Sequence, residues 1–274
     1  MTSTPRRFLP YGRQQIGDDD IAAVTGVLRG DTLTTGPKVA AFEQALGGAT
    51  GASHAVACSS GSAALHLAAM ALDLGPGDKV VVPTLTFLAT ANVVRLTGAE
   101  VVFADVDAAT GLMGPENLAT ALGREDSGEV KAVFAVHYAG QCATPDQLAV
   151  VTDGLPVVAD SCHALGTAYG LGGKVGDCRH AIMETFSFHP VKTIAAGEGG
   201  AVTTNDGVLA QQLRRLRNHG MTREPDSFVR GELARDGAGE ANPWYYEMAE
   251  LGLNYRLSDI HCALGLSQLG KLDT

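Results

Sequence analysis

Short apolar runs alternate with helix-like runs along most of this chain, and this alternation constrains the fold more than any other feature of the sequence. Several apolar runs lack polar alternation, which is typical of strands in a sheet that helices cover on both faces. The predicted strands are residues 54–58, 79–82, 100–105, 132–137, 157–160, 185–188 and 200–204. The predicted helices between them include residues 62–72, 89–97, 115–122 and 207–216. The pattern therefore predicts an α/β domain.

The composition is that of a globular protein with one large core and no general role in binding nucleic acid. Hydrophobic residues make up 45% of the 274 residues and charged residues 18%, a balance that argues against disorder. The formal net charge is −10, whereas proteins that bind nucleic acid usually need a basic face to displace counterions from phosphates. Local arginines can still bind a small anion.

The cysteines and the apolar segments indicate a cytoplasmic protein. The five cysteines are scattered without CxxC spacing, so we expect reduced thiols rather than a disulfide framework or a zinc ribbon, and no metal site. The first 20 residues contain no apolar signal-peptide core, and the apolar runs elsewhere are short and interrupted by glycine, proline or charge. We therefore expect no membrane segment.

Both ends of the chain are predicted to carry helices. The run DDDIAAVTGVLRGD has acidic residues in its first turn and apolar residues at helical spacing. At the other end, SDIHCALGLSQLGKLDT is predicted to be helical up to Thr274, with no capping glycine and no closing element. We therefore expect a further segment to follow it in a parent protein.

Asp160 and Lys192 are the two residues that most constrain the chemistry. Asp160 ends the apolar run in VVADSCH, and ligands bind at the carboxyl ends of strands in open α/β sheets. Lys192 follows 32 residues later, among serine, histidine and glycines. An enzyme that holds pyridoxal phosphate (PLP) needs such a pair: Asp160 would keep the pyridine nitrogen protonated, and Lys192 would form the Schiff base and move protons. The alternatives are a helix N-cap for Asp160 and a surface position for Lys192.

A phosphate cup is predicted where the strand at 54–58 leads into an alanine-rich helix through SSGS. The N–H groups at the helix start, the small Gly61 and the hydroxyls of Ser60 and Ser62 suit a phosphate. Ser187, in FSFHPVKTIAAGEGG, can donate a further hydrogen bond. The alternative is ordinary serine capping of a helix, and for GEGG a loose turn.

Two ring residues and a run of arginines have both a functional and a structural interpretation. Phe87, in PTLTFLATAN, can stack on a flat cofactor or lie in the core. His163 can touch the phenolic oxygen of PLP or be a core histidine. The arginines of LRRLRNHGMTRE can attract a nucleotide diphosphate, but a solvated helix face is the more frequent reason for such a run. GLGGKV lacks the Ser or Thr that a P-loop needs after its lysine.

The chain resembles the DegT/DnrJ/StrS family of nucleotide-sugar aminotransferases from Pro10 to Thr274. The segments that carry the resemblance occur in the order and at roughly the spacing of the family: SSGSAALHLA, PTLTFLATAN, VVADSCHALG, SFHPVKTIAAGEGGAV and LGLNYRLSDIHCALG. The family implies a fold type I, aspartate-aminotransferase-like large domain with a mostly parallel mixed sheet flanked by helices. On this resemblance, residues 1–274 are one PLP-binding large domain that includes an N-terminal approach segment, and the family's small C-terminal domain is absent.

The resemblance also implies roles for individual residues. Lys192 corresponds to the Schiff-base lysine, Asp160 to the partner of the pyridine nitrogen, Phe87 to the stacking ring and His163 to the neighbour of the phenolic oxygen. The residues that would hold the phosphate are Ser60, Gly61, Ser62, Ser187 and, from the neighbouring subunit of a homodimer with shared active sites, Asn254. The candidates for substrate contacts are Thr34, Thr35, Tyr138 and His189.

Further segments resemble the family members that act in pseudaminic acid biosynthesis: FAVHYAGQ, DCRHA, LRNHGMTRE and PWYYEMAELGLNYRLSD. That resemblance implies transfer of an amino group from glutamate to the 4-keto carbon of a UDP-linked 6-deoxy-N-acetylamino sugar. Lys192 argues against the sugar dehydratases of the family, which have histidine at this position. Two alternatives stay open: another nucleotide-sugar aminotransferase, or a truncated PLP-binding protein with little turnover and a regulatory or scaffold role.

Overall fold

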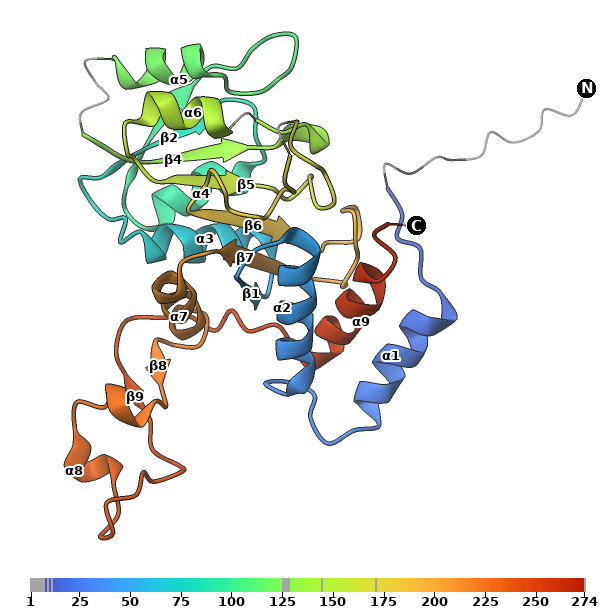
Figure 1. Cartoon of the computed structure of the whole chain (residues 1–274), viewed down its shortest axis with the longest axis vertical. Helices are drawn as coiled ribbons and strands as arrows, with labels where there is room; N and C mark the ends of the chain where they lie inside the picture. The colour runs from blue at the N-terminus through green and yellow to red at the C-terminus, as the bar shows by residue number, and fades with distance from the viewer. Residues whose placement is uncertain are drawn as a thin grey trace, which may run out of the picture.

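A seven-stranded sheet forms the centre of the molecule (Figure 1). The structure, a computed structural model, describes residues 8, 10, 12–124, 129–143, 145–170 and 172–273. The strand order is β1-β7-β6-β5-β4-β2-β3, and within this sheet β7 runs antiparallel to the other six strands. The strands are β1 (His54–Cys58), β2 (Lys79–Pro83), β3 (Glu100–Ala104), β4 (Val130–Val136), β5 (Val157–Asp160), β6 (Met183–Ser187) and β7 (Gly200–Thr204). The expectation of a mostly parallel mixed sheet is confirmed, and all seven predicted strands are present.

Helices cover both faces of this sheet, which explains why its strands lack polar alternation. Along β1, Val56 and Cys58 lie in one core cluster, whereas Ala55 and Ala57 lie in another. Residues of α3 (Gly61–Ala71), α4 (Leu88–Leu96) and α7 (Gly207–Leu216) belong to the first cluster. Residues of α2 (Pro37–Thr50) and α9 (Asp259–Leu269) belong to the second, and those of α5 (Pro115–Leu122) and α6 (Pro145–Thr152) to a third. Helix α6 was not predicted from the sequence.

The N-terminal part of the chain is fastened to α9 by buried polar side chains. Helix α1 (Asp18–Leu28) lies beside α9 in Figure 1. The carboxylate of Asp259 accepts the N–H groups of Gly36 (2.7 Å) and Lys38 (2.9 Å) and so caps the start of α2. Near the other end of α9, Gln268 Nε2 donates to Gln15 O (2.9 Å) and to Asp20 Oδ2 (2.8 Å). These contacts hold the segment before α1 against the C-terminal turn of α9.

Helix α9 ends earlier than the sequence analysis predicts. Gly270 is its C-cap, so the prediction of an uncapped helix up to Thr274 is wrong, and Thr274 itself lies outside the described residues. Beyond the cap, Leu272 packs against the core cluster of α2 and α9, close to Gly166. This hydrophobic contact lies just after the cap, where helix ends are often fixed in this way.

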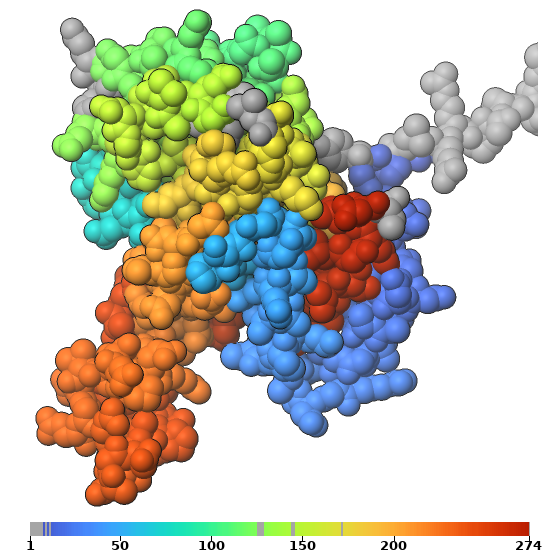
Figure 2. Space-filling model, in the orientation of Figure 1, coloured from blue at the N-terminus to red at the C-terminus, as the bar shows by residue number. Residues whose placement is uncertain are grey.

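An arm extends away from the sheet between α7 and α9 (Figures 1 and 2). Its strands β8 (Met221–Thr222) and β9 (Glu247–Met248) pair antiparallel, and it contains the 3-10 turn η3 (Pro225–Ser227) and the short helix α8 (Gly231–Ala234). Within the part of the chain that the structure describes, no helix is long and apolar enough to cross a bilayer, and no group of side chains has the composition of a metal site.

Candidate active site

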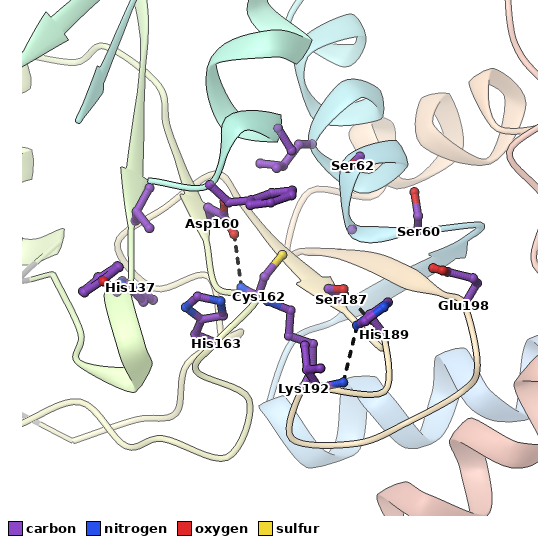
Figure 3. Close-up of a pocket in the computed structure, with 17 residues that line it drawn as sticks. Ser60, Ser62, His137, Asp160, Cys162, His163, Ser187, His189, Lys192 and Glu198 are labelled. Carbon is purple, nitrogen blue, oxygen red and sulfur yellow. Dashed lines mark hydrogen bonds between the residues drawn. The ribbon is translucent and has the colours of Figure 1, made fainter. Parts of the chain in front are cut away.

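A cavity of about 290 Å³ opens at the carboxyl ends of β5 and β6, beside the first turn of α3 (Figure 3). Ten of the residues proposed from the sequence line it: Ser60, Gly61, Ser62, Phe87, Tyr138, Asp160, His163, Ser187, His189 and Lys192. Its volume is at the lower end of the range for small-molecule sites. The fold therefore gathers segments that are far apart in the sequence around one space.

Three residues proposed from the sequence do not line this cavity. Thr34 forms an isolated bridge with Ser258, and Thr35 follows it with a positive φ of 58°. Asn254 forms a similar bridge with Asn218 and is exposed. Its expected role is in the site of a neighbouring subunit, which stays a prediction, as do the substrate contacts of the two threonines.

Asp160 lies at the floor of the cavity with its carboxylate fixed by two donors. Its side chain is buried, with the residue 6% exposed. Thr90 Oγ1 donates to Oδ2 (2.8 Å), and the N–H of Cys162 donates to Oδ1 (3.2 Å). Because turns and no helix follow β5, the alternative of a helix N-cap is wrong. A buried carboxylate that keeps only two protein donors can accept a further hydrogen bond from a ligand.

Lys192 lies on a closed loop after β6 and lines the cavity, so it is not an ordinary surface lysine. Its backbone N–H donates to His189 O (2.8 Å), and Phe188 closes the loop through bonds to Gly199 and Ala196 (2.8 Å each). Its half-buried side chain extends toward Cys162 and His163 (Figure 3). The lysine and Asp160 thus share one cavity.

His163 is exposed at the rim of this cavity, which excludes the alternative of a core histidine. Partial burial lowers the pKa of the imidazole, the nearby charge of Lys192 lowers it further, and Asp160 opposes both effects. The neutral ring accepts the N–H of Ala139 at Nδ1 (3.4 Å). Its other nitrogen is then the protonated one and can donate to a ligand oxygen.

The start of α3 forms a narrow cup in which glycine is required. Ser60 is the N-cap, and its Oγ accepts the N–H of Ala63 (3.0 Å), so the capping interpretation of this serine is confirmed. A Cβ on Gly61 would lie 2.7 Å from Ser187 Cβ. A Cβ on Gly200, in the GEGG segment, would lie 2.2 Å from Ser60 O. Gly200 is therefore the tightly packed first residue of β7, whereas Gly197 and Glu198 form an exposed bend before it, as the alternative of a turn expects. The cup can receive an anion at the helix N-terminus.

Phe87 presents its ring to the cavity from the N-cap position of α4. It is 70% exposed, so the alternative of a core phenylalanine is wrong. The apolar Ala89 also lines the cavity. An exposed aromatic ring at a cavity wall is suited to cover a flat ligand.

The sequence analysis missed the residues that orient Asp160 and complete the walls. Thr90 is fully buried and donates to Asp160, and its own oxygen lies 2.8 Å from that of Thr86. Cys162 and Glu198 line the cavity. Thr90 lies within PTLTFLATAN, but its role could be recognised only once the fold had placed that segment beside β5.

A buried polar network behind the cavity was also missed. Glu184 is 1% exposed, and its carboxylate accepts Ser161 Oγ and Gly176 N (2.8 Å each), Cys178 N and Tyr169 Oη (3.2 Å each). Four donors around two oxygens suit an ionised carboxylate, although burial raises its pKa. The glutamate of METFS, in a strand with buried neighbours, is the sequence signal from which such a network could have been predicted.

His137 joins this network to the cavity wall as a neutral imidazole. It is fully buried, and burial lowers its pKa to about 4, against an opposing effect of Asp160. Its Nδ1 accepts the N–H of Ala143 (3.1 Å), so Nε2 carries the proton and donates to Tyr169 Oη (3.0 Å). Glu184 Oε2 is 3.9 Å from Nε2, but a charged ring would lose the acceptor that Ala143 needs.

The arginines of LRRLRNHGMTRE are engaged in structural contacts, which supports the interpretation of most of them as part of a helix face. Arg217 bonds Glu43 and the carbonyl of Ala57, and Arg214 approaches the same carboxylate at 3.6 Å. Arg215 pairs with Glu250 at 2.7 Å. Arg223 lies over the ring of Tyr246, 5.8 Å from its centre.

Comparisons with known proteins agree with this geometry. Residues 14–274 match the family model described as the DegT/DnrJ/EryC1/StrS aminotransferase family. The chain is similar to Helicobacter pylori PseC, an aminotransferase involved in the biosynthesis of pseudoaminic acid, with 30% identity and a TM-score of 0.84 over 97% of this chain and 66% of that one. It is also similar to the PLP-form of the putative sugar aminotransferase Spr1654 from Streptococcus pneumoniae (28% identity, TM-score 0.81, 96% and 66% covered).

A third similar structure is S. venezuelae DesV in complex with a ketimine intermediate (31% identity, TM-score 0.78, 93% and 62% covered). The chain thus spans slightly less than two thirds of the length of these proteins. The match extends over the sheet, the cavity and α9, because the family model covers nearly all of the chain. The chain belongs to the DegT/DnrJ/EryC1/StrS aminotransferase family.

Proposed function

We propose that this chain forms the PLP-binding part of an aminotransferase that delivers an amino group to a keto sugar carried on a nucleotide. The observation that carries the proposal is the meeting of Asp160 and Lys192 at one cavity beside the N-terminus of α3. A buried carboxylate, a lysine and an anion-binding helix end are the three groups that PLP requires. Enzymes of this family use PLP, and Spr1654 has been solved in PLP and PMP forms.

The residues of the cavity fit this cofactor. Gly61 leaves a space that a Cβ would fill, and Ser62 and Ser187 line the cavity beside it, so the cup suits the phosphate. Asp160, held by Thr90, would keep the ring nitrogen protonated. When bound, PLP supplies an electron sink for the carbon that loses or gains a proton.

Three side chains would act around the ring. The amine of Lys192 would hold the aldehyde carbon, give way to the amine of the donor, and then carry the proton between the two carbons that exchange it. Phe87 would cover one face of the ring and exclude water. His163, as a neutral donor, would bind the phenolic oxygen, while Tyr138 and His189 at the rim would contact the substrate.

We further propose glutamate as the donor and the 4-keto carbon of a UDP-linked 6-deoxy-N-acetylamino sugar as the acceptor. The similarity to PseC and the segments that resemble this group of enzymes support that choice. The five free cysteines support a reducing compartment, the cytoplasm. A homodimer in which Asn254 reaches the phosphate of the neighbouring site is supported by its exposed position outside its own cavity.

Replacement of Lys192 tests the proposal directly. Wild-type protein incubated with PLP and reduced with borohydride should carry a pyridoxyl group on the peptide that contains Lys192, as located by mass spectrometry. Lys192→Ala should lose this label, whereas Lys38→Ala, which removes an exposed lysine at the start of α2, should keep it. A label of wild-type strength in the Lys192 variant contradicts the assignment.

Incubation of the PLP-loaded protein with glutamate separates an enzyme from a binding protein. A transaminase should change its absorption spectrum and release one 2-oxoglutarate per cofactor. An unchanged spectrum, with the cofactor still attached, would favour the regulatory or scaffold role.

A further inference from the structure

A second cavity, of about 500 Å³, lies on the other side of the lysine loop from the cofactor cavity. The approach segment from Arg13 to Gly17, the loop from Pro190 to Ala195 and the C-terminal turn of α9 form its walls. Among the described residues, only Lys192 lines both this cavity and the cofactor cavity. Lys192 therefore borders both cavities.

The walls of this second cavity are held in place by Gln268. Its amide nitrogen donates to Gln15 O and Asp20 Oδ2, and its amide oxygen accepts the N–H of Ala195 (3.4 Å). Gln268 is 8% exposed, so these hydrogen bonds are largely shielded from water. Closer to the start of the approach segment, a Cβ on Gly12 would lie 3.4 Å from Val191 Cβ, so the segment runs directly along the lysine loop.

The charge of the lining is positive, in contrast to the rest of the protein. The described lining includes Arg13, Lys192 and Lys271 and contains no acidic residue, although the whole chain has a formal net charge of −10. Lys271 is neutralised by Asp19 and Asp20, at 2.9 and 2.7 Å. Arg13 is exposed, and among the described residues no carboxylate pairs with it. Its guanidinium is thus available to a ligand.

This arrangement suits an anion more than a neutral sugar. An acidic protein repels anions at long range, so an anionic substrate needs a local cation close to the reacting group. The guanidinium of arginine matches the oxygens of phosphates and carboxylates with two parallel hydrogen bonds. The amides of Gln14 and Gln15 add polar groups that carry no opposing charge.

We propose that this second cavity binds the anionic group of a substrate, with Arg13 as the residue that recognises it. The proposal rests on the function proposed above, which offers two sources of the same chemistry: the diphosphate of the nucleotide sugar and the carboxylates of the amino donor. In either case, the anion is held at Arg13 while the reacting atoms of the substrate lie at Lys192.

Binding measurements without turnover test this proposal. The probes are UDP, for the nucleotide, and glutarate, which has the two carboxylates of the donor but no amine. Each is titrated by calorimetry into PLP-saturated protein, so that the cofactor's own phosphate site is filled. Arg13→Ala should weaken the binding of at least one probe by roughly ten- to a hundredfold, the range for a lost hydrogen bond to a charged group. Arg29→Ala, which removes an exposed arginine after α1, should leave both unchanged.

A second pair of variants changes the charge without removing Arg13. Gln14→Glu places a carboxylate in the cavity lining and should weaken the same probe, whereas Gln211→Glu makes the same change on the exposed face of α7. Loss of UDP binding alone assigns the diphosphate, and loss of glutarate binding alone assigns the carboxylates. The proposal is overturned if the wild-type protein binds neither probe, or if both cavity variants bind both probes within twofold of wild type.

These outcomes are independent of the lysine chemistry. If borohydride labelling fails at Lys192 but UDP binding still depends on Arg13, the anion cavity stands and the proposed function falls. If labelling succeeds at Lys192 but the binding of both probes is independent of Arg13, the proposed function stands and the anion cavity falls.

Discussion

The neutral imidazole of His137 makes the stability of this protein depend on pH in a defined window. Burial lowers its pKa from 6.5 to about 4. Between these two pH values the imidazole is protonated in the unfolded chain but neutral in the folded protein. The free energy of unfolding therefore falls as the pH falls from about 6.5 to about 4. At about pH 5 the unfolded imidazole is almost fully protonated and the folded one hardly at all. Since one pKa unit corresponds to about 1.4 kcal/mol, the loss between about pH 7.5 and pH 5 is about 2 kcal/mol.

The groups that face His137 do not reverse this sign. Tyr169 Oη accepts a hydrogen bond from the Nε2–H of His137, and the carboxylate of Glu184 already accepts hydrogen bonds from four other donors. Asp160 favours the charged ring, but burial outweighs it. Asp20 is also sensitive to acid. Burial raises its pKa, but the hydrogen bonds from Lys271, Gln268 and the N–H of Gly17 are among several that together outweigh burial and lower the pKa to about 2. That carboxylate loses its contribution only below its unfolded pKa of 3.8, outside the window of His137.

His137→Asn is the variant that isolates this contribution, since the asparagine oxygen can still accept the N–H of Ala143. Urea unfolding of both proteins at a series of pH values from about 7.5 to 5 gives two curves of unfolding free energy. The variant should be less stable at neutral pH, but its curve should be flatter by about 2 kcal/mol over this range. Exposed and half-buried histidines contribute equally to both curves and cancel. Curves that stay parallel within about 0.5 kcal/mol, well below the expected 2 kcal/mol, would refute a buried neutral imidazole.

Two further substitutions test the cup and the orientation of the carboxylate. Gly61→Ala forces a Cβ to within 2.7 Å of Ser187, and such overpacking should lower the unfolding free energy by about 1–3 kcal/mol and reduce the PLP that stays bound in gel filtration. Gly48→Ala, with open space around its Cβ inside α2, should be neutral or stabilising in the same assays, and equal effects of both would contradict the cup. Thr90→Val removes the donor to the buried Asp160 and should cost about 1.5–3 kcal/mol in urea unfolding, whereas Thr90→Ser should recover most of it; a valine variant as stable as wild type would show that this bond is dispensable.

Local patterns in the sequence were sufficient for the sheet and for most of the cavity. Most of the strands are short and apolar because both of their faces are buried, so they stand out without reference to the rest of the fold. The edge strand β3 is partly exposed. Asp160, Lys192 and the SSGS segment were likewise recognisable, since strand ends and helix starts define where ligands bind in an α/β sheet. The end of α9 was misplaced because Gly270 was taken as part of the helix.

Residues that act through a partner far away in the sequence were not accessible to this reasoning. Thr90 lies 70 residues before the carboxylate that it fixes. Nothing near Arg13 in the sequence indicates that the approach segment runs along the loop of Lys192.

The sequence by itself therefore determined the class of fold, the family and two residues that meet at one cavity, because periodicity, strand ends and helix starts are local properties. Only the tertiary structure decided which polar groups share an environment. It placed His137, Tyr169 and Glu184 in one buried network, and it put a positively charged cavity on the other side of Lys192 in an acidic protein. Hydrogen bonding and electrostatic effects depend on distance and burial in three dimensions, and these quantities exist only once the chain has folded.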